Sequence, residues 1–114
     1  VFKADPGGIL TLALAGIGLI YQSESLFLGR VNPFTPVGSV ADLAALIGTA
    51  HRLMTRNASR PSQSTTGDER RPHFVYGRAG RPCLRCGARV RTAMQGAPPR
   101  ARDAYWCPVC QPSD

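Results

Sequence analysis

Four cysteines arranged as two C-x2-C pairs constrain this chain more than any other feature. Cys83 and Cys86 form the first pair, Cys107 and Cys110 form the second, and twenty residues lie between the pairs. Each pair can hold a metal ion from one tight turn, and together they supply a tetrahedral set of four thiolates. The spacing lies at the edge of a common zinc-binding pattern, in which a β-hairpin brings the two pairs together. The sequence therefore predicts one structural Zn²⁺ ion, with no coordination position left for a catalytic water.

Two disulfides are the alternative use of these cysteines, and they are typical of small secreted domains. The sequence does not support secretion, because the apolar run at residues 9–20 follows a single lysine, Lys3, which Asp5 offsets. The run is also too short to cross about 30 Å of hydrocarbon as a helix, and Gly16 and Gly18 interrupt it. We interpret it as buried core and expect a cytoplasmic protein without a membrane segment.

The basic residues are concentrated in the second half of the chain. Fourteen basic and seven acidic residues give a net charge of +7, and the stretch from Arg70 to Arg102 holds nine arginines and no acid. Because the guanidinium fork pairs with phosphate oxygens, this field favours nucleic-acid binding, and a solubilising basic surface is the alternative. Arg85 and Arg89 are expected to screen the charge of the thiolates, whereas Arg100 and Arg102 could reach a duplex backbone.

Two helical regions are predicted in the first half. Residues 8–28 form two helical pieces around a glycine turn, and the second piece ends at Gly29, a favourable C-cap residue. In residues 40–57 the apolar positions recur at helical spacing. Ser39 is the expected N-cap of this helix, with Asp42 three residues on as a short capping-box partner.

The glycine turn at Gly16 and Gly18 has two interpretations. Backbone amides at such a turn can approach an anion, and the following helix N-terminus adds partial positive charge. The same glycines could make a tight turn between two packed helices. Glu24 is the only acid of the first helical region, and we expect its carboxylate to bind backbone groups around this turn.

The second half is predicted to be a loop followed by a small hairpin. Residues 60–72 are polar and typical of a loop, and residues 74–76 begin an extended stretch. Residues 90–92 and 105–106 are expected to be the arms of a hairpin, with its tip near residues 96–99.

The predicted architecture is mainly α with a small β part. It comprises a helical region at residues 1–58, a polar linker at residues 59–74 and a four-cysteine zinc hairpin at residues 75–114. The sequence contains no plausible Ser/His/Asp set, no paired carboxylates and no Walker-type glycine loop. Cysteines that bind zinc are also unavailable as nucleophiles.

Several segments together resemble one known family. Residues 75–87 and 105–111 closely resemble the C-terminal zinc finger of the bacterial formamidopyrimidine-DNA glycosylase/endonuclease VIII family. Residues 15–27 resemble the helix–two-turn–helix element of that family, and residues 64–68 resemble a loop of its actinobacterial endonuclease VIII-like members. The resemblance covers residues 9–112, nearly the whole chain.

This resemblance implies a role in DNA base-excision repair near the bacterial nucleoid. Members of the family flip a damaged base out of the duplex, attack the sugar through an N-terminal proline amine assisted by a glutamate, and cleave the strand as lyases. Their helix–two-turn–helix element and zinc finger clamp the DNA backbone. By resemblance, Tyr76 and Arg102 match phosphate-contacting positions, and Gly16 and Gly18 match the phosphate-binding turn. The implied partner is damaged double-stranded DNA.

The sequence departs from the family pattern in three respects. The catalytic proline and glutamate belong to an N-terminal β-sandwich domain that is not in this sequence, which opens at Val1, so we expect the isolated chain to be inactive. Leu19 stands where the turn normally has an asparagine, which removes a polar contact of about 1 kcal/mol. Asp103 places a carboxylate beside Arg102. We therefore expect weaker DNA binding than in a complete family member.

Two other function classes stay open at this point. One is a non-enzymatic DNA-binding or regulatory zinc protein derived from the family, which the reading frame upstream of Val1 would distinguish. The other is a zinc ribbon that binds proteins and is indifferent to DNA. Binding to duplex DNA that weakens with salt would argue against the latter, because arginine–phosphate contacts release counterions.

Overall fold

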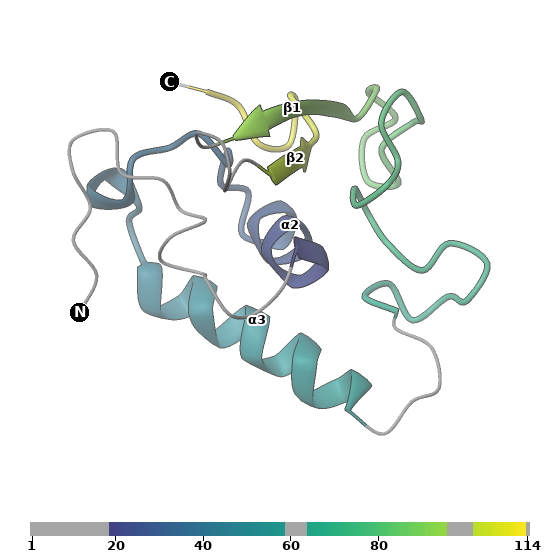
Figure 1. Ribbon diagram of the computed structural model, residues 1–114, viewed down its shortest axis with the longest axis horizontal. Coiled ribbons are helices and arrows are strands. Elements are labelled where there is room, and N and C mark those ends of the chain that lie inside the picture. Colours follow the sequence, from purple (N-terminus) through teal and green to yellow (C-terminus); the bar gives the residue numbers. More distant parts are fainter. Residues whose placement is uncertain (1–18, 59–63, 96–101, 114) are drawn as a thin grey trace.

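The computed structural model describes residues 19–58, 64–95 and 102–113 and places two helices beside a small hairpin (Figure 1). Helix α2 spans Leu19–Leu28, a short 3₁₀ helix η1 spans Val37–Ser39, and helix α3 spans Leu43–Asn57. Strands β1 (Arg91–Gln95) and β2 (Arg102–Trp106) pair antiparallel, with Arg91 opposite Trp106. The predicted class, mainly α with a small β-hairpin, is confirmed.

Helix α2 ends where the sequence predicts, although its glycine has a different role from the expected one. The left-handed residue at this end is Arg30, with φ of 58°. Gly29 instead lies at a closely packed point, where a Cβ atom would be 3.3 Å from Cδ1 of Leu46 on α3 and that side chain would have to shift. The two helices can therefore approach closely at this point.

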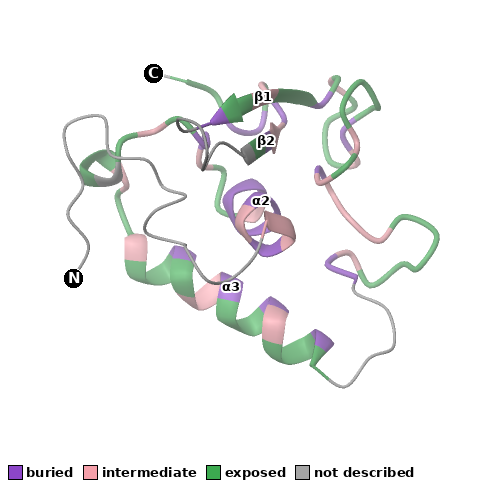
Figure 2. Cartoon of the chain, in the orientation of Figure 1, coloured by how far each residue is buried: buried purple, intermediate pink, exposed green. Residues whose placement is uncertain are grey.

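Helix α3 begins later than expected, and its N-cap is Asp42 rather than Ser39. Oδ1 of Asp42 accepts a hydrogen bond from the amide of Ala45 at 2.9 Å. Ser39 is unavailable because it closes η1, where its own amide donates to the carbonyl of Pro36 at 2.9 Å. Figure 2 shows the buried positions of α3 along one side of the helix, toward α2. They are Leu46, Ala50, Leu53 and Asn57.

The main core joins helix α2 to the hairpin. Its buried members come from α2, from the segment before the first cysteine pair, from the residue just before β1 and from the cysteines themselves. They are Phe27, Val75, Cys83, Val90, Cys107 and Cys110. A second cluster of Leu26 and Leu46 holds α2 against α3. Helix α2 is thus the central element, with α3 on one side and the cysteine hairpin on the other (Figure 1).

The segment at residues 74–76 forms a bend and a turn, so the prediction of an extended stretch is wrong. The amide of Arg78 donates to the carbonyl of Val75 at 3.0 Å, and Gly77 takes a left-handed φ of 70°. The physical reason is a buried carboxylate from α2 that gathers successive amides of this segment, as described below.

The predicted apolar run is largely outside the described residues, which begin at Leu19. None of the helices in the ranges that the structure describes is both long enough and apolar enough to cross a membrane.

Candidate metal centre and nucleic-acid interface

The four cysteine sulfurs converge on one point between the two turns. Their Sγ atoms all lie within 4.8 Å of one another. The Sγ atoms of Cys86 and Cys107 are 3.3 Å apart, and those of Cys83 and Cys110 are 3.9 Å apart. A tetrahedral ion with metal–sulfur bonds of about 2.3 Å places its ligands about 3.8 Å apart. The cluster therefore has the donor set and the size of a four-thiolate zinc site.

The two turns present their sulfurs with matching backbone geometry. In the first, the amide of Gly87 donates to the carbonyl of Cys83 at 2.8 Å, and in the second, the amide of Gln111 donates to that of Cys107 at 2.8 Å. The sulfur of Cys83 accepts the amide two residues on at 3.3 Å, and the sulfur of Cys107 accepts the amide of Cys110 at 3.4 Å. Such amide donors stabilise thiolate charge, which a metal ligand carries.

The thiols differ in their electrostatic surroundings. Burial raises the pKa of the Cys107 thiol to about 12. Burial acts in the same direction on Cys110, but a hydrogen bond from Nε of Arg85 at 3.3 Å, together with the neighbouring thiols, lowers its pKa to about 7. The prediction that Arg85 screens the cluster is confirmed. Arg89 instead donates from Nη1 to the carbonyl of Gly80 at 3.0 Å.

Polar contacts fix the cysteine turns to the end of α2 and to the residues that follow it. Nη2 of Arg85 donates to the carbonyl of Phe27 at 2.9 Å, and the guanidinium carbon lies 3.9 Å from the centre of the Phe27 ring. Nε2 of the fully buried Gln111 donates to the carbonyl of Val31 at 2.8 Å. Nδ2 of Asn32 in turn donates to the carbonyl of Gln111 at 3.0 Å. The hairpin is therefore docked on the helical part and is not a free appendage.

Glu24 is fully buried and organises the segment before the first cysteine pair. Its Oε1 accepts the amide of Phe74 at 2.6 Å, and its Oε2 accepts the amides of Val75 at 2.9 Å and Tyr76 at 3.2 Å. The hydroxyl of Thr65 also donates to Oε1. Backbone pairing was expected for Glu24, but its partners are amides about fifty residues after Glu24 itself, and the glycine turn lies outside the described residues.

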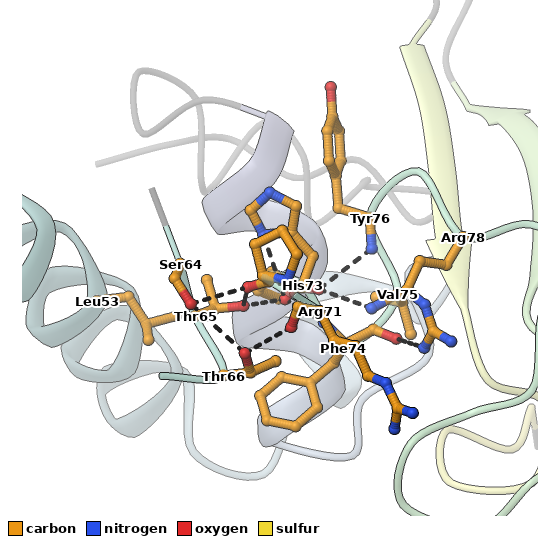
Figure 3. A network of polar contacts seen from close by, with 12 residues as sticks. Leu53, Ser64, Thr65, Thr66, Arg71, His73, Phe74, Val75, Tyr76 and Arg78 are labelled. Carbon is orange, nitrogen blue, oxygen red and sulfur yellow. Dashed lines mark hydrogen bonds and ion pairs between the residues drawn. The ribbon is translucent and has the colours of Figure 1, made fainter. Parts of the chain in front are cut away.

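The polar segment predicted as a loop is held by the side chain of Asn57 and by a backbone hydrogen bond between its own ends. Asn57, the last residue of α3, donates from Nδ2 to the carbonyl of Ser64 at 3.0 Å and accepts the Ser64 amide at 2.9 Å. The amide of Thr65 donates to the carbonyl of Pro72 at 2.7 Å, which closes residues 65–72 on themselves. Figure 3 shows this network beside α2, with the segment carrying His73 to Arg78 leading away from it.

A basic cavity of about 490 Å³ opens beside this segment. Residues of the polar loop, of the turn after it and of the approach to the first cysteine line the cavity. The ionisable ones are Arg70, Arg71, His73, Tyr76, Arg78 and Arg81. The sequence shows the arginine-rich stretch but does not predict this cavity, because the turns that bring the side chains together have no periodic pattern.

The four predicted DNA-contacting residues fall into two groups. Tyr76 lies at the cavity, with its ring edge-on to that of His73 at a centroid distance of 5.6 Å. Arg102 is the first residue of β2, and its side chain lies outside the described part. Gly16 and Gly18 also lie outside it. The structure thus brings the four cysteines together and places Tyr76 at the basic cavity.

Comparison with known proteins finds relatives over almost the whole chain, although no protein-family model matches it. A probable endonuclease 8 2 from Streptomyces coelicolor is 50% identical over 117 residues, covering 96% of this chain and 42% of that protein. The DNA-(apurinic or apyrimidinic site) lyase Nei2 from Mycolicibacterium smegmatis is 41% identical, with 95% and 44% covered. A formamidopyrimidine-DNA glycosylase from Paraburkholderia phymatum is 35% identical, with 86% and 38% covered.

The solved structures give the same result. A formamidopyrimidine-DNA glycosylase of Lactococcus lactis, in complex with DNA containing an abasic site, superposes with a TM-score of 0.71 at 25% identity. The match covers 94% of this chain and 43% of that chain. The chain thus spans less than half the length of the relatives that it matches.

Proposed function

Because this chain belongs to the formamidopyrimidine-DNA glycosylase/endonuclease VIII family, of which it spans the C-terminal region, we propose that it is the part that clamps damaged duplex DNA. One observation carries this proposal. The four-cysteine hairpin is fixed to the end of helix α2 by Arg85 and to Val31, just after that helix, by Gln111, so that an arginine-rich segment is held on a structured support. A preorganised basic surface of this kind suits binding to a phosphate backbone.

Zn²⁺ is the metal that we propose for the cysteine cluster. The residues that would hold it are Cys83, Cys86, Cys107 and Cys110, whose sulfurs have the number and spacing of a closed zinc site. The ion would supply cross-linking of the two turns and no chemistry, because four thiolates fill its coordination sphere. The hairpin is too small to bury a hydrophobic core of its own, so the free energy of metal binding would stabilise its folded state.

We further propose that Tyr76 and Arg102 contact DNA phosphates, together with the backbone at Gly16 and Gly18. The support for this assignment is the match to the family's motifs and, for Tyr76, its position at the basic cavity. Leu19 and the exposed Asp103 are expected to weaken the clamp, the first by loss of a polar contact and the second by placing a carboxylate near phosphate.

The direct test is fluorescence anisotropy with the zinc-loaded chain and a duplex of about 15 base pairs, intact or with one abasic site. We expect binding that weakens steeply with salt, because each phosphate contact releases a counterion. No binding at any salt concentration, by a chain shown to hold one zinc ion, would leave the protein-binding zinc ribbon as the better assignment.

Catalysis is tested separately. We expect no covalent adduct when the 114-residue chain is treated with borohydride on DNA containing an abasic site, because the sequence lacks the family's proline–glutamate pair. An adduct would show that another amine attacks the sugar. If the chain binds duplex DNA but forms no borohydride adduct, it acts as a DNA-binding module. The reading frame upstream of Val1 then distinguishes a fragment of an enzyme from a regulatory protein.

A further inference from the structure

The basic cavity contains more positive charge than the described chain neutralises. Arg70, Arg71, Arg78 and Arg81 line it, and within the described ranges none of their guanidinium groups pairs with a carboxylate. Among the residues that the structure describes, the only hydrogen bond of these guanidinium groups is from Nη1 of Arg78 to the carbonyl of Phe74, at 3.1 Å. Four guanidinium groups that share one cavity repel one another unless an anion lies between them.

Neither Glu24 nor Asp68 supplies that anion. Glu24 lies beneath the same segment, but it is fully buried and its oxygens accept three backbone amides and the hydroxyl of Thr65. Nδ1 of His73, which lines the cavity, is 3.9 Å from its Oε1. Asp68 accepts the backbone amide of Arg70 at 2.9 Å, and this contact leaves the guanidinium of Arg70 unpaired.

The wall of the cavity is built on a fixed framework rather than on a flexible loop. The amide of Arg81 donates to the carbonyl of Arg78 at 2.9 Å, and the carbonyl of Arg81 accepts the amide of Val90 at 2.9 Å. This pairing connects one side of the cavity to the cysteine hairpin, while Glu24 connects the other side to α2. Because the backbone that carries these arginines is already fixed, less backbone entropy is lost when they bind a ligand.

We propose that this cavity binds a phosphodiester group of duplex DNA, as a contact additional to the family's phosphate-binding positions. The proposal rests on the DNA-binding function proposed above. Its four guanidinium forks match the geometry of phosphate oxygens without Tyr76, which belongs to the positions already proposed, and a volume of about 490 Å³ accommodates a phosphate with its sugar. A carboxylate-rich protein segment is the competing ligand class, and the phosphate is favoured because the arginine field extends into the hairpin.

The test compares two double variants that each remove two positive charges. Arg70→Gln with Arg81→Gln alters two cavity side chains whose guanidinium groups have no contact with described residues, so the fold is expected to persist. The matched control, Arg52→Gln with Arg56→Gln, lies on helix α3. Zinc content and chemical denaturation verify that both are folded.

Anisotropy with the same duplex between 50 and 300 mM salt gives the result. For the cavity variant we expect about tenfold weaker binding at 100 mM salt, and a slope of log K against log salt that is shallower by about 1.8, or 0.9 for each lost contact. The control variant should change the affinity less than about threefold. A cavity variant that behaves as the control does, while the unaltered chain binds DNA, overturns this inference and leaves the proposed function standing.

Two other outcomes are also decisive. If the unaltered, zinc-loaded chain does not bind duplex DNA, then the proposed function fails, and the inference fails with it. If a decaglutamate peptide displaces the duplex at equal concentration, and its own binding is lost in the cavity variant, then the cavity belongs to an acidic protein segment and the phosphodiester assignment is wrong.

Discussion

Arg85 and Phe27 connect the metal cluster to the end of helix α2. The guanidinium carbon of Arg85 lies 3.9 Å from the centre of the Phe27 ring, while Nη2 donates to the Phe27 carbonyl at 2.9 Å. The Nε atom of the same side chain donates to Sγ of Cys110 at 3.3 Å. The Arg85 side chain therefore donates to a free carbonyl at a helix C-terminus and also stabilises the negative charge of a sulfur in the cysteine cluster.

Replacing this arginine should loosen the junction. We expect Arg85→Ala to lower the free energy of unfolding of the zinc-loaded protein by about 2 kcal/mol, through two hydrogen bonds and a cation–π contact. Urea denaturation measures the effect. Arg89→Ala, which removes a single contact to the Gly80 carbonyl, is the control and should cost less than about 1 kcal/mol. Equal losses in the two variants would contradict the junction role.

Glu24→Gln should destabilise the protein more than any exposed charge change. In the unaltered protein, several backbone amides donate to the Glu24 carboxylate. The glutamine side chain would place an NH₂ donor among these donors, which should lower the free energy of unfolding by about 3 kcal/mol. Hydrogen exchange supplies a specific readout. In the variant, the exchange rates of the Phe74, Val75 and Tyr76 amides should rise more than those of the amides in α3. Glu69→Gln, at an exposed position, should leave stability and exchange unchanged. Unaltered exchange at residues 74–76 in the Glu24 variant would refute this role.

Gln111→Ala should separate the second cysteine turn from the helical part. It removes the donor to the half-buried Val31 carbonyl and the acceptor of the Cys107 amide, at 2.8 and 2.9 Å, and leaves the Cys107 amide buried without this partner. We expect a loss of about 2 to 3 kcal/mol in urea denaturation, and faster zinc transfer to a chelator. Val109→Ala, with a side chain 63% exposed, is the neighbouring control. Identical transfer rates in the two variants would show that Gln111 does not support the metal site.

Zinc binding should release protons in a pH-dependent manner. Thiols must ionise to bind, so the affinity should rise with pH, because the metal-free site holds more protons. Cys107, with a pKa raised to about 12, releases its proton throughout the range from pH 6 to 8. Cys110, with a pKa lowered to about 7, contributes about 0.8 proton less at pH 8 than at pH 6.

Calorimetry in buffers with different ionisation enthalpies measures this release. Arg85→Ala removes the hydrogen bond that lowers the pKa of Cys110, so the decline in proton release should move to higher pH in this variant. A release profile that does not change on Arg85→Ala would rule out the contribution of the guanidinium.

Features with a local sequence pattern could be predicted from the sequence alone. The cysteine spacing predicted the cluster and its hairpin, and the apolar spacing predicted α3 almost to its last residue, Asn57. Contacts between segments that lie far apart in the chain could not be predicted in this way. The amides that bind Glu24 lie fifty residues away in a segment without periodicity, and Gln111 resembles an ordinary polar residue of a chain end. At the start of α3, Ser39 and Asp42 both fit an N-cap, and the 3₁₀ turn from Pro36 decided between them.

The four sulfurs of the cluster are not equally protected. Cys83, Cys107 and Cys110 are buried against the core, whereas Cys86 is exposed. A peroxide or a competing chelator can therefore reach the cluster at one corner first, and that corner belongs to the turn closed by the amide of Gly87. Under oxidative conditions, the lifetime of a bound metal ion would then depend on this one solvent-exposed thiolate. The proposed DNA clamp would lose the metal that cross-links its two cysteine turns in steps, beginning with the release of Cys86.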